Sequence, residues 1–103
     1  MNPIKKPKQI KVGGHYYAIS YEEGLEARFN KLGTSDINGG KITIEPNSMD
    51  SFKSATLIHE VLHIIGYHNC NRKLDEEIIQ SLSESLWLLL EQHGVAFDWS
   101  GIE

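Results

Sequence analysis

The sequence predicts an α+β fold in which a small antiparallel sheet packs against a two-helix hairpin. Two stretches indicate β structure: residues 10–21 are rich in β-branched and aromatic side chains, and residues 41–45 alternate strictly between polar and apolar. Two later stretches, residues 49–65 and 74–93, carry apolar side chains at helical spacing. The sheet is therefore expected from the first half of the chain and the helices from the second.

The first half begins with residues 1–9, which hold two prolines and three lysines and are expected to be a flexible N-terminal lead-in. Residues 10–103 are then expected to form a single domain. The glycine pair at 13–14 supplies the turn of a β-hairpin. Residues 33–40 are rich in turn formers, and Pro46 ends the next strand because proline cannot donate to a sheet ladder.

The second half supplies two helices. Apolar side chains cover most of the first helix, so it is expected to be largely buried and to end at Gly66. The second helix is expected to begin at Leu74 or Asp75, with acidic residues in its first turn, where the helix dipole favours them. Phe97 and Trp99 are expected to pack back on the domain. The side chains expected to face inward from the second helix are Ile78, Ile79, Leu82, Leu86, Leu89 and Leu90.

Composition limits the class of protein. The 103 residues include 10 lysines and arginines against 14 aspartates and glutamates, and this net charge of −4 argues against a nucleic-acid partner. Cys70 is the only cysteine, no apolar run follows Met1, and no apolar run is long enough to span a bilayer. We therefore expect a cytoplasmic protein without a membrane partner. The oligomeric state is left open, with a dimer through the leucine-rich segment 86–90 as one option.

The motif His59-Glu60-Val61-Leu62-His63 lies inside the first predicted helix. Residues four apart share one face of a helix, so both imidazoles can bind one zinc ion. Glu60 then projects beside the open coordination position, where it can take a proton from a zinc-activated water and pass it to a leaving amine. Two histidines and a glutamate on a largely apolar helix are costly to bury without such a role.

A catalytic zinc site of this type needs a third protein ligand. The chain continues Gly66-Tyr67-His68-Asn69, which is similar to the extended metzincin pattern HExxHxxGxxH until Asn69 replaces its last ligand. A carboxylate from the second helix is the alternative. Glu76 shares a helical face with the apolar stripe that turns toward the first helix, so it is the predicted ligand. Glu77 and His68 are its rivals, and two histidines with one carboxylate also suit iron or manganese.

These segments resemble a known family. Residues 56–63, 74–77 and 82–87 look like small zincin-like proteins encoded by phages and mobile elements of Gram-positive bacteria. They are also similar to minimal gluzincins, in which a short sheet precedes the HExxH helix and a second helix supplies a glutamate. The resemblance covers residues 10–93 and implies zinc, a zincin-like fold and a bacterial or phage origin. It implies no particular substrate.

The predicted function is hydrolysis of peptide bonds in a peptide or protein substrate by a zinc-activated water. His59, His63 and Glu76 would hold Zn²⁺, and Glu60 would act as general base and then as general acid. The alternative is a non-catalytic, zinc-stabilised binding or regulatory protein of phage origin.

Further residues are expected to contact the substrate. In zincins the strand before the motif helix is an edge that pairs with an extended peptide, so the resemblance implies that Ile42, Thr43 and Ile44 bind substrate. Tyr67 and His68 follow the motif and could stabilise the oxyanion that forms at a polarised carbonyl.

Overall fold

The computed structural model describes residues 2–5, 8–12, 14–25, 27, 31–69 and 75–100. Cys70 and Leu74 lie outside these residues. The described elements, in chain order, are β1 (Asn2–Lys5), β2 (Gln9–Val12), β3 (His15–Tyr21), β4 (Gly33–Asp36), β5 (Lys41–Ile44), α2 (Asp50–Asn69), α3 (Glu76–Gln92) and β6 (Val95–Asp98).

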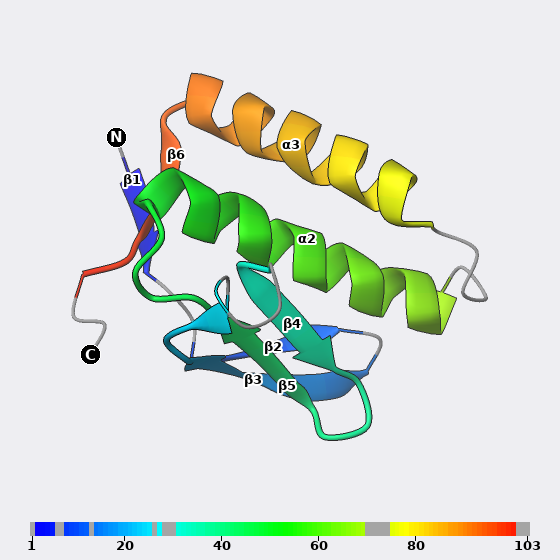
Figure 1. Ribbon diagram of the computed structural model, residues 1–103. Coiled ribbons are helices and arrows are strands. Elements are labelled where there is room, and N and C mark those ends of the chain that lie inside the picture. The colour runs from blue at the N-terminus through cyan, green and yellow to red at the C-terminus, as the bar shows by residue number, and fades with distance from the viewer. Residues whose placement is uncertain are drawn as a thin grey trace.

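The elements are arranged in layers (Figure 1). Four strands form one sheet in the order β2-β3-β5-β4, and α2 lies across one face of it. The antiparallel helix α3 packs on the side of α2 that faces away from the sheet. The fold is therefore α+β, with a sheet packed against a helical hairpin.

The four-stranded sheet is mixed, which corrects the prediction of an antiparallel sheet. β2 and β3 form the predicted hairpin, with Val12 opposite His15, but β5 runs parallel to β3 and antiparallel to β4. The sequence also predicts only a turn at residues 33–40, where Gly33–Asp36 form β4. The apolar strand β5 takes the interior position and the polar strand β4 the edge. Because the chain reverses direction from β3 to β4 and again from β4 to β5, β3 and β5 run in the same direction, and their pairing is parallel.

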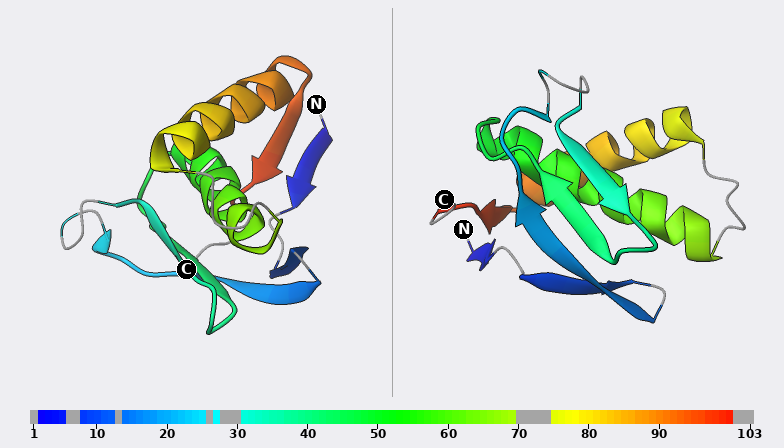
Figure 2. Two further views of the ribbon diagram at one scale, coloured as in Figure 1. Left: turned by 90° about the vertical axis from the view of Figure 1, so that its right-hand side faces the viewer. Right: turned by 60° about the horizontal axis from the view of Figure 1, so that its bottom comes forward.

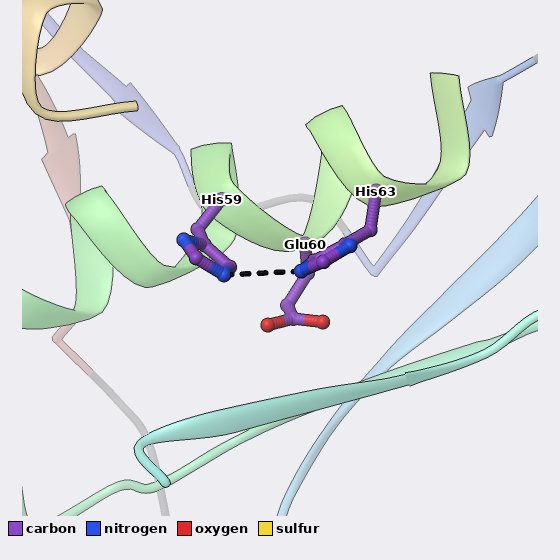
Figure 3. A group of neighbouring side chains, drawn as sticks. All are labelled: His59, Glu60 and His63. Carbon is purple, nitrogen blue, oxygen red and sulfur yellow. Dashed lines mark hydrogen bonds between the residues drawn. The ribbon is translucent and has the colours of Figure 1, made fainter. Parts of the chain in front are cut away.

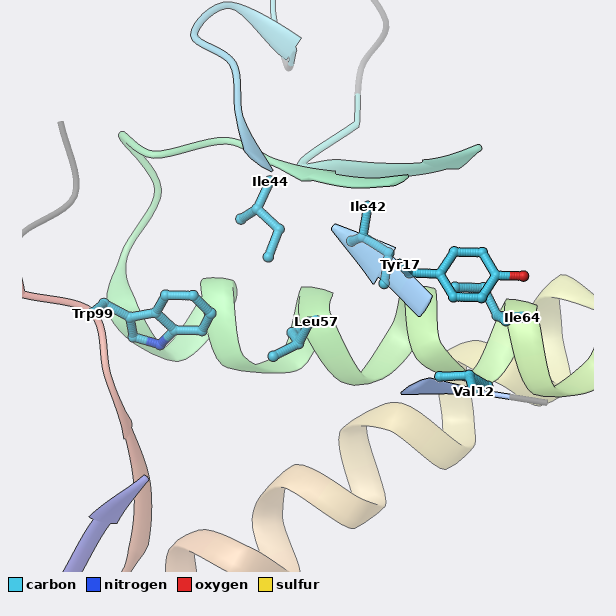
Figure 4. Close-up of a cluster of buried hydrophobic side chains, with 7 residues drawn as sticks. All are labelled: Val12, Tyr17, Ile42, Ile44, Leu57, Ile64 and Trp99. Atoms are coloured by element: carbon cyan, nitrogen blue, oxygen red, sulfur yellow. The ribbon is translucent and has the colours of Figure 1, made fainter. Parts of the chain in front are cut away.

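The core lies between the sheet and α2 (Figure 4). Trp99 confirms the predicted packing of the C-terminal segment, because it is 5% exposed and its indole N–H donates to Ser54 Oγ at 2.9 Å. Full burial of a large apolar side chain contributes roughly 1.5–3 kcal/mol, so this cluster holds α2 firmly on the sheet. Its members are Val12, Tyr17, Ile42, Ile44, Leu57, Ile64 and Trp99.

α2 is longer than predicted. Gly66 lies inside the helix and is buried, and the helix continues to Asn69. The added turn is held by the sheet, because Nε2 of His68 lies 2.6 Å from the hydroxyl of Tyr17 on β3. Tertiary contacts therefore override the tendency of glycine to end a helix. None of the described helices is long and apolar enough to cross a membrane.

α3 begins as predicted but presents a different face to the core. Asp75 caps it, and the Asp75 carboxylate accepts the backbone N–H of Ile78 at 2.9 Å. Ile79 and Ser83 are the buried side chains of this helix. The predicted inward set is wrong for four residues that are 40–50% exposed: Ile78, Leu82, Leu86 and Leu89. Because α3 packs mainly on the single helix α2, only a narrow face is covered.

A second, two-stranded sheet lies beside the helices (Figure 2). β1 pairs in parallel with β6, with Asn2 opposite Val95 and Lys5 opposite Asp98. Residues 2–5, expected within a flexible lead-in, are therefore placed in a strand. The pairing satisfies backbone groups that a separate lead-in would leave to water.

Candidate metal centre

The two motif histidines project from the same face of α2, because they lie about one helical turn apart. Their Nε2 atoms are 3.1 Å apart, and their rings meet edge to face at a centroid distance of 4.8 Å (Figure 3). The side chains of His59 and His63 are 15% and 32% exposed. Both side chains are thus largely shielded but not fully buried.

The third member of the cluster is Glu76, the first residue of α3. Its Oε1 lies 2.9 Å from Nε2 of His59, and its Oε2 lies 2.9 Å from Nε2 of His63. The antiparallel packing of α3 on α2 brings the start of α3 to the motif. Of the predicted candidates, the structure places Glu76 against the histidines, although its side chain is 66% exposed. Glu77 is exposed as well, and His68 contacts Tyr17 instead.

The separations among the donor atoms can be compared with those around a tetrahedral metal ion. Ligand atoms about 2.0–2.1 Å from a tetrahedral zinc lie roughly 3.3 Å from one another. The two Nε2 atoms are 3.1 Å apart, close to that spacing, and each lies 2.9 Å from a different oxygen of the Glu76 carboxylate. The group of His59, Glu60 and His63, with ligand atoms within 4.8 Å of one another, could hold a metal ion.

Glu60 occupies a different environment from Glu76. It is 6% exposed, and its carboxylate points away from α2 toward β4 (Figure 3). Burial raises the pKa of the Glu60 carboxyl; the hydrogen bond from the Ser35 side chain and the charge of His63 oppose that rise in pKa. A carboxylate that binds protons more readily than usual, held beside the donor cluster, suits a general base.

β4 borders the site because Gly33 allows it to approach α2 closely. A Cβ at this position would lie 2.4 Å from Cγ2 of Thr56 and 3.6 Å from Cγ of Glu60. Ser35, two residues along the strand, faces the same side and reaches Glu60. The sequence prediction missed Gly33 and Ser35, since Gly-Thr-Ser-Asp has low β-propensity and indicates a turn.

The prediction that residues 42–44 form an edge strand is wrong. β5 is not an edge, because β3 and β4 pair with it on either side. Ile42 and Ile44 are fully buried core residues, and the hydroxyl of Thr43 lies 3.1 Å from Ser20 Oγ. The backbone of residues 42–44 therefore cannot pair with a peptide. The edge strand beside the donor cluster is β4.

Tyr67 and His68 also lie elsewhere than expected. His68 stacks on His15 at a centroid distance of 5.1 Å and contacts Tyr17, and the ring of Tyr67 meets that of His68 edge to face. These contacts turn His68 toward β3, so its Nε2 is engaged away from the donor cluster. The structure thus contradicts an oxyanion role for His68 and leaves Tyr67 outside the residues that line the site.

An open cleft of about 1120 Å³ contains the donor cluster and runs between β4 and α3, with α2 as its floor. The donor cluster lies at one end of the cleft, and large apolar side chains line the other end, beside the first turns of α2. The lining residues are Lys31, Leu32, Gly33, Thr34 and Ser35 around β4; Ser51, Phe52, Ala55, Thr56, His59, Glu60 and His63 on α2; and Glu76, Gln80, Ser83, Glu84, Trp87 and Leu88 on α3.

Comparison with known proteins returns no significant match: no family model fits the chain, and no curated protein or solved structure is significantly similar to it. Function therefore has to be inferred from the side chains of the cleft.

Proposed function

We propose that this chain is a zinc-dependent peptidase with a zincin-like site, of the kind that its sequence resembles. One observation carries the proposal: His59, His63 and Glu76 bring two imidazole nitrogens and a carboxylate within 2.9–3.1 Å of one another. A buried glutamate, Glu60, lies beside them in an open cleft. A structural zinc site does not require that glutamate, whereas hydrolysis does.

Each residue has a distinct task in this proposal. His59 and His63 hold the metal from one helix and Glu76 from the next, so the site forms only when α2 and α3 pack together. The bound zinc supplies a Lewis acid that polarises a carbonyl and makes water more acidic. Glu60 accepts the proton of the attacking water and delivers it to the leaving amine. Ser35 orients the Glu60 carboxylate by hydrogen bonding to it.

The backbone of β4 is suited to align a peptide beside these groups. The N–H of Glu45 donates to the carbonyl of Leu32, which turns Leu32 toward the sheet. Alternate residues of an antiparallel strand bond to the partner, so Gly33 and Ser35 direct their backbone groups to the open edge. An extended peptide that pairs there lies along the cleft, with its carbonyl groups near the donor cluster.

The test combines metal content with peptide cleavage. Wild-type protein and the Glu60→Gln variant are purified, their zinc is quantified by mass spectrometry, and each is incubated with a complex peptide mixture in which new termini are sequenced. We expect about one zinc per chain in both proteins and cleavage by the wild type alone, because the amide that replaces the Glu60 carboxylate cannot accept a proton. A matched Glu77→Gln variant, altered at an exposed carboxylate, should keep both properties.

Two other outcomes separate the alternatives. Zinc in both proteins with cleavage by neither would favour a non-catalytic, zinc-stabilised binding or regulatory protein. Absence of zinc from a wild-type protein that has been exposed to the metal would sink the proposal altogether.

A further inference from the structure

We propose that the cleft extends from the metal centre into an apolar subsite that binds a bulky apolar side chain of a peptide substrate. The subsite consists of Phe52 on α2 with Trp87 and Leu88 on α3, all of which line the same cleft. This inference rests on the proposed function, because the metal centre anchors the peptide whose side chain the subsite receives.

The three side chains give this part of the cleft an apolar lining. Phe52 is 51% exposed and Leu88 is 56% exposed, so both leave large apolar areas in contact with solvent. Trp87 is half-buried and stacks on Phe97 at a centroid distance of 6.3 Å, which fixes its ring at this place. Exposed apolar groups that gather in a cleft, rather than singly on a convex surface, mark a binding site.

The register of the two helices places this subsite away from the metal centre. Glu76 contacts His63, and the two helices run antiparallel with the same rise per residue. Moving the same number of residues along α3 and back along α2 therefore sets Trp87 opposite Phe52. Phe52 lies about 14 Å along the helix axis from the midpoint of the two histidines, at about 1.5 Å per residue. An extended peptide covers that length with about four residues.

The direction of β4 decides which part of the peptide reaches the subsite. Gly33 lies against Thr56 and Ser35 reaches Glu60, so β4 runs from the apolar end of the cleft toward the donor cluster. Antiparallel pairing is the more stable arrangement, so the peptide runs the opposite way. The subsite then receives the third or fourth residue on the C-terminal side of the cleaved bond, since side chains of α3 lean back toward its N-terminus and the metal centre.

Peptide hydroxamates test this inference without a known substrate, because the hydroxamate binds zinc and anchors the chain. One series carries the hydroxamate on the N-terminus of tetraalanine amide, with a single phenylalanine scanned through the four positions. A second series carries it on the C-terminus. Dissociation constants for zinc-loaded protein are measured by calorimetry. We expect phenylalanine at the third or fourth position of the first series to tighten binding roughly tenfold over alanine.

Two variants and a matched control define the subsite. Phe52→Ser and Leu88→Gln should remove most of this tenfold gain and leave the affinity for the tetraalanine probe unchanged. Leu89→Gln alters the next residue of α3, which is 50% exposed and lies outside the cleft lining, so it should keep the gain. Equal affinities at all four positions, a gain in the second series only, or a gain that survives both variants would overturn the inference. Failure of every probe to bind zinc-loaded protein would overturn the proposed function as well.

Discussion

The two faces of α2 carry histidines in contrasting settings. On the cleft face, Nε2 of His59 and of His63 converge within 3.1 Å, and the carboxylate of Glu76 closes the group. On the sheet face, Nε2 of His68 lies 2.6 Å from the neutral hydroxyl of Tyr17, and its ring stacks on His15. One helix therefore carries two histidines whose nitrogens lie close together in the cleft and a third histidine that contacts the sheet.

The difference shows what makes a histidine a candidate ligand. Nearness of imidazoles does not suffice, since the rings of His15 and His68 are also within 5.1 Å of each other. Convergence of several donor atoms on one point, together with a carboxylate, is what a cation requires. A nitrogen that already faces a buried phenol has its hydrogen-bonding capacity in use. The following substitutions test whether the cleft-face residues bind a metal and whether the sheet-face residues stabilise the fold.

The largest effect is expected from removing a cleft-face histidine. His63→Ala should weaken zinc binding by far more than the roughly 10–100-fold that loss of an outer-shell partner costs, because a ligand itself is lost. His68→Ala should leave zinc affinity within about twofold, yet lower the free energy of unfolding by about 1–3 kcal/mol, since the buried Tyr17 hydroxyl loses its partner. Chelator competition and urea denaturation measure the two quantities. Similar losses of zinc affinity in both variants would erase the distinction between the faces.

The second-largest effect is expected from substitution of Glu76, the carboxylate that contacts both cleft-face histidines. Glu76→Gln keeps the size of the side chain but replaces the charged ligand oxygen with a neutral amide oxygen. Zinc affinity should therefore fall by at least the roughly 10–100-fold that loss of an outer-shell partner costs, yet by less than in His63→Ala, which removes its donor atom altogether. The neighbouring Glu77→Gln, which alters a likewise exposed residue, should change zinc affinity less than about twofold, because it is Glu76 that contacts both histidines. The same chelator competition ranks the two variants. A larger loss of zinc affinity in Glu77→Gln would show that Glu76 is not the third ligand.

The sequence is sufficient to predict the grouping of the cleft-face residues because these residues lie close together along the chain. Helical spacing alone places His59 and His63 on one face, and a short connection to a second helix limits the third candidate to a few residues. The choice of Glu76 follows from its position on the face of α3 that also holds Ile79 and Ser83. These residues are brought together as predicted, whereas the binding of a metal stays a prediction.

Features that depend on contacts distant in sequence could not be predicted. The interior position of β5 follows from its pairing with β3, which sets Ala18 opposite Lys41, 23 residues away. β4 was missed for a different reason: it pairs with β5 across a short turn, but Gly-Thr-Ser-Asp has low β-propensity. α3 is apolar around half its circumference, so its periodicity could not decide whether Ile78 or Ile79 faces α2. His68 is a rival ligand on sequence grounds for the same reason, since its partner Tyr17 lies 51 residues away.

A smaller effect is expected where β4 meets the cleft face of α2. Gly33→Ala would place a methyl group 2.4 Å from Cγ2 of Thr56 and 3.2 Å from the carbonyl oxygen of Thr43. Overpacking of this kind costs about 1–3 kcal/mol, and we expect that loss in the free energy of unfolding measured in urea. Adding Thr56→Ser removes Cγ2 and should restore most of the loss. A double variant no more stable than Gly33→Ala would show that Thr56 does not limit the approach of β4.

The smallest effect concerns the hydrogen bond on the sheet face. Burial raises the pKa of the Tyr17 phenol above its ordinary value of 10.0, so the folded protein keeps this proton at a pH where the unfolded chain has lost it. The unfolded state then binds fewer protons, and the free energy of unfolding should fall as pH rises above about 10. Tyr17→Phe should cost about 1 kcal/mol at pH 7 and make that alkaline decline shallower. Part of the decline should remain, because burial also raises the pKa of Tyr21.

Urea denaturation at pH 7 and at pH 10–11 measures both effects, with zinc affinity at pH 7 expected to be unchanged. An equally steep decline in Tyr17→Phe would mean that Tyr17 loses its proton equally readily in the folded and unfolded chains.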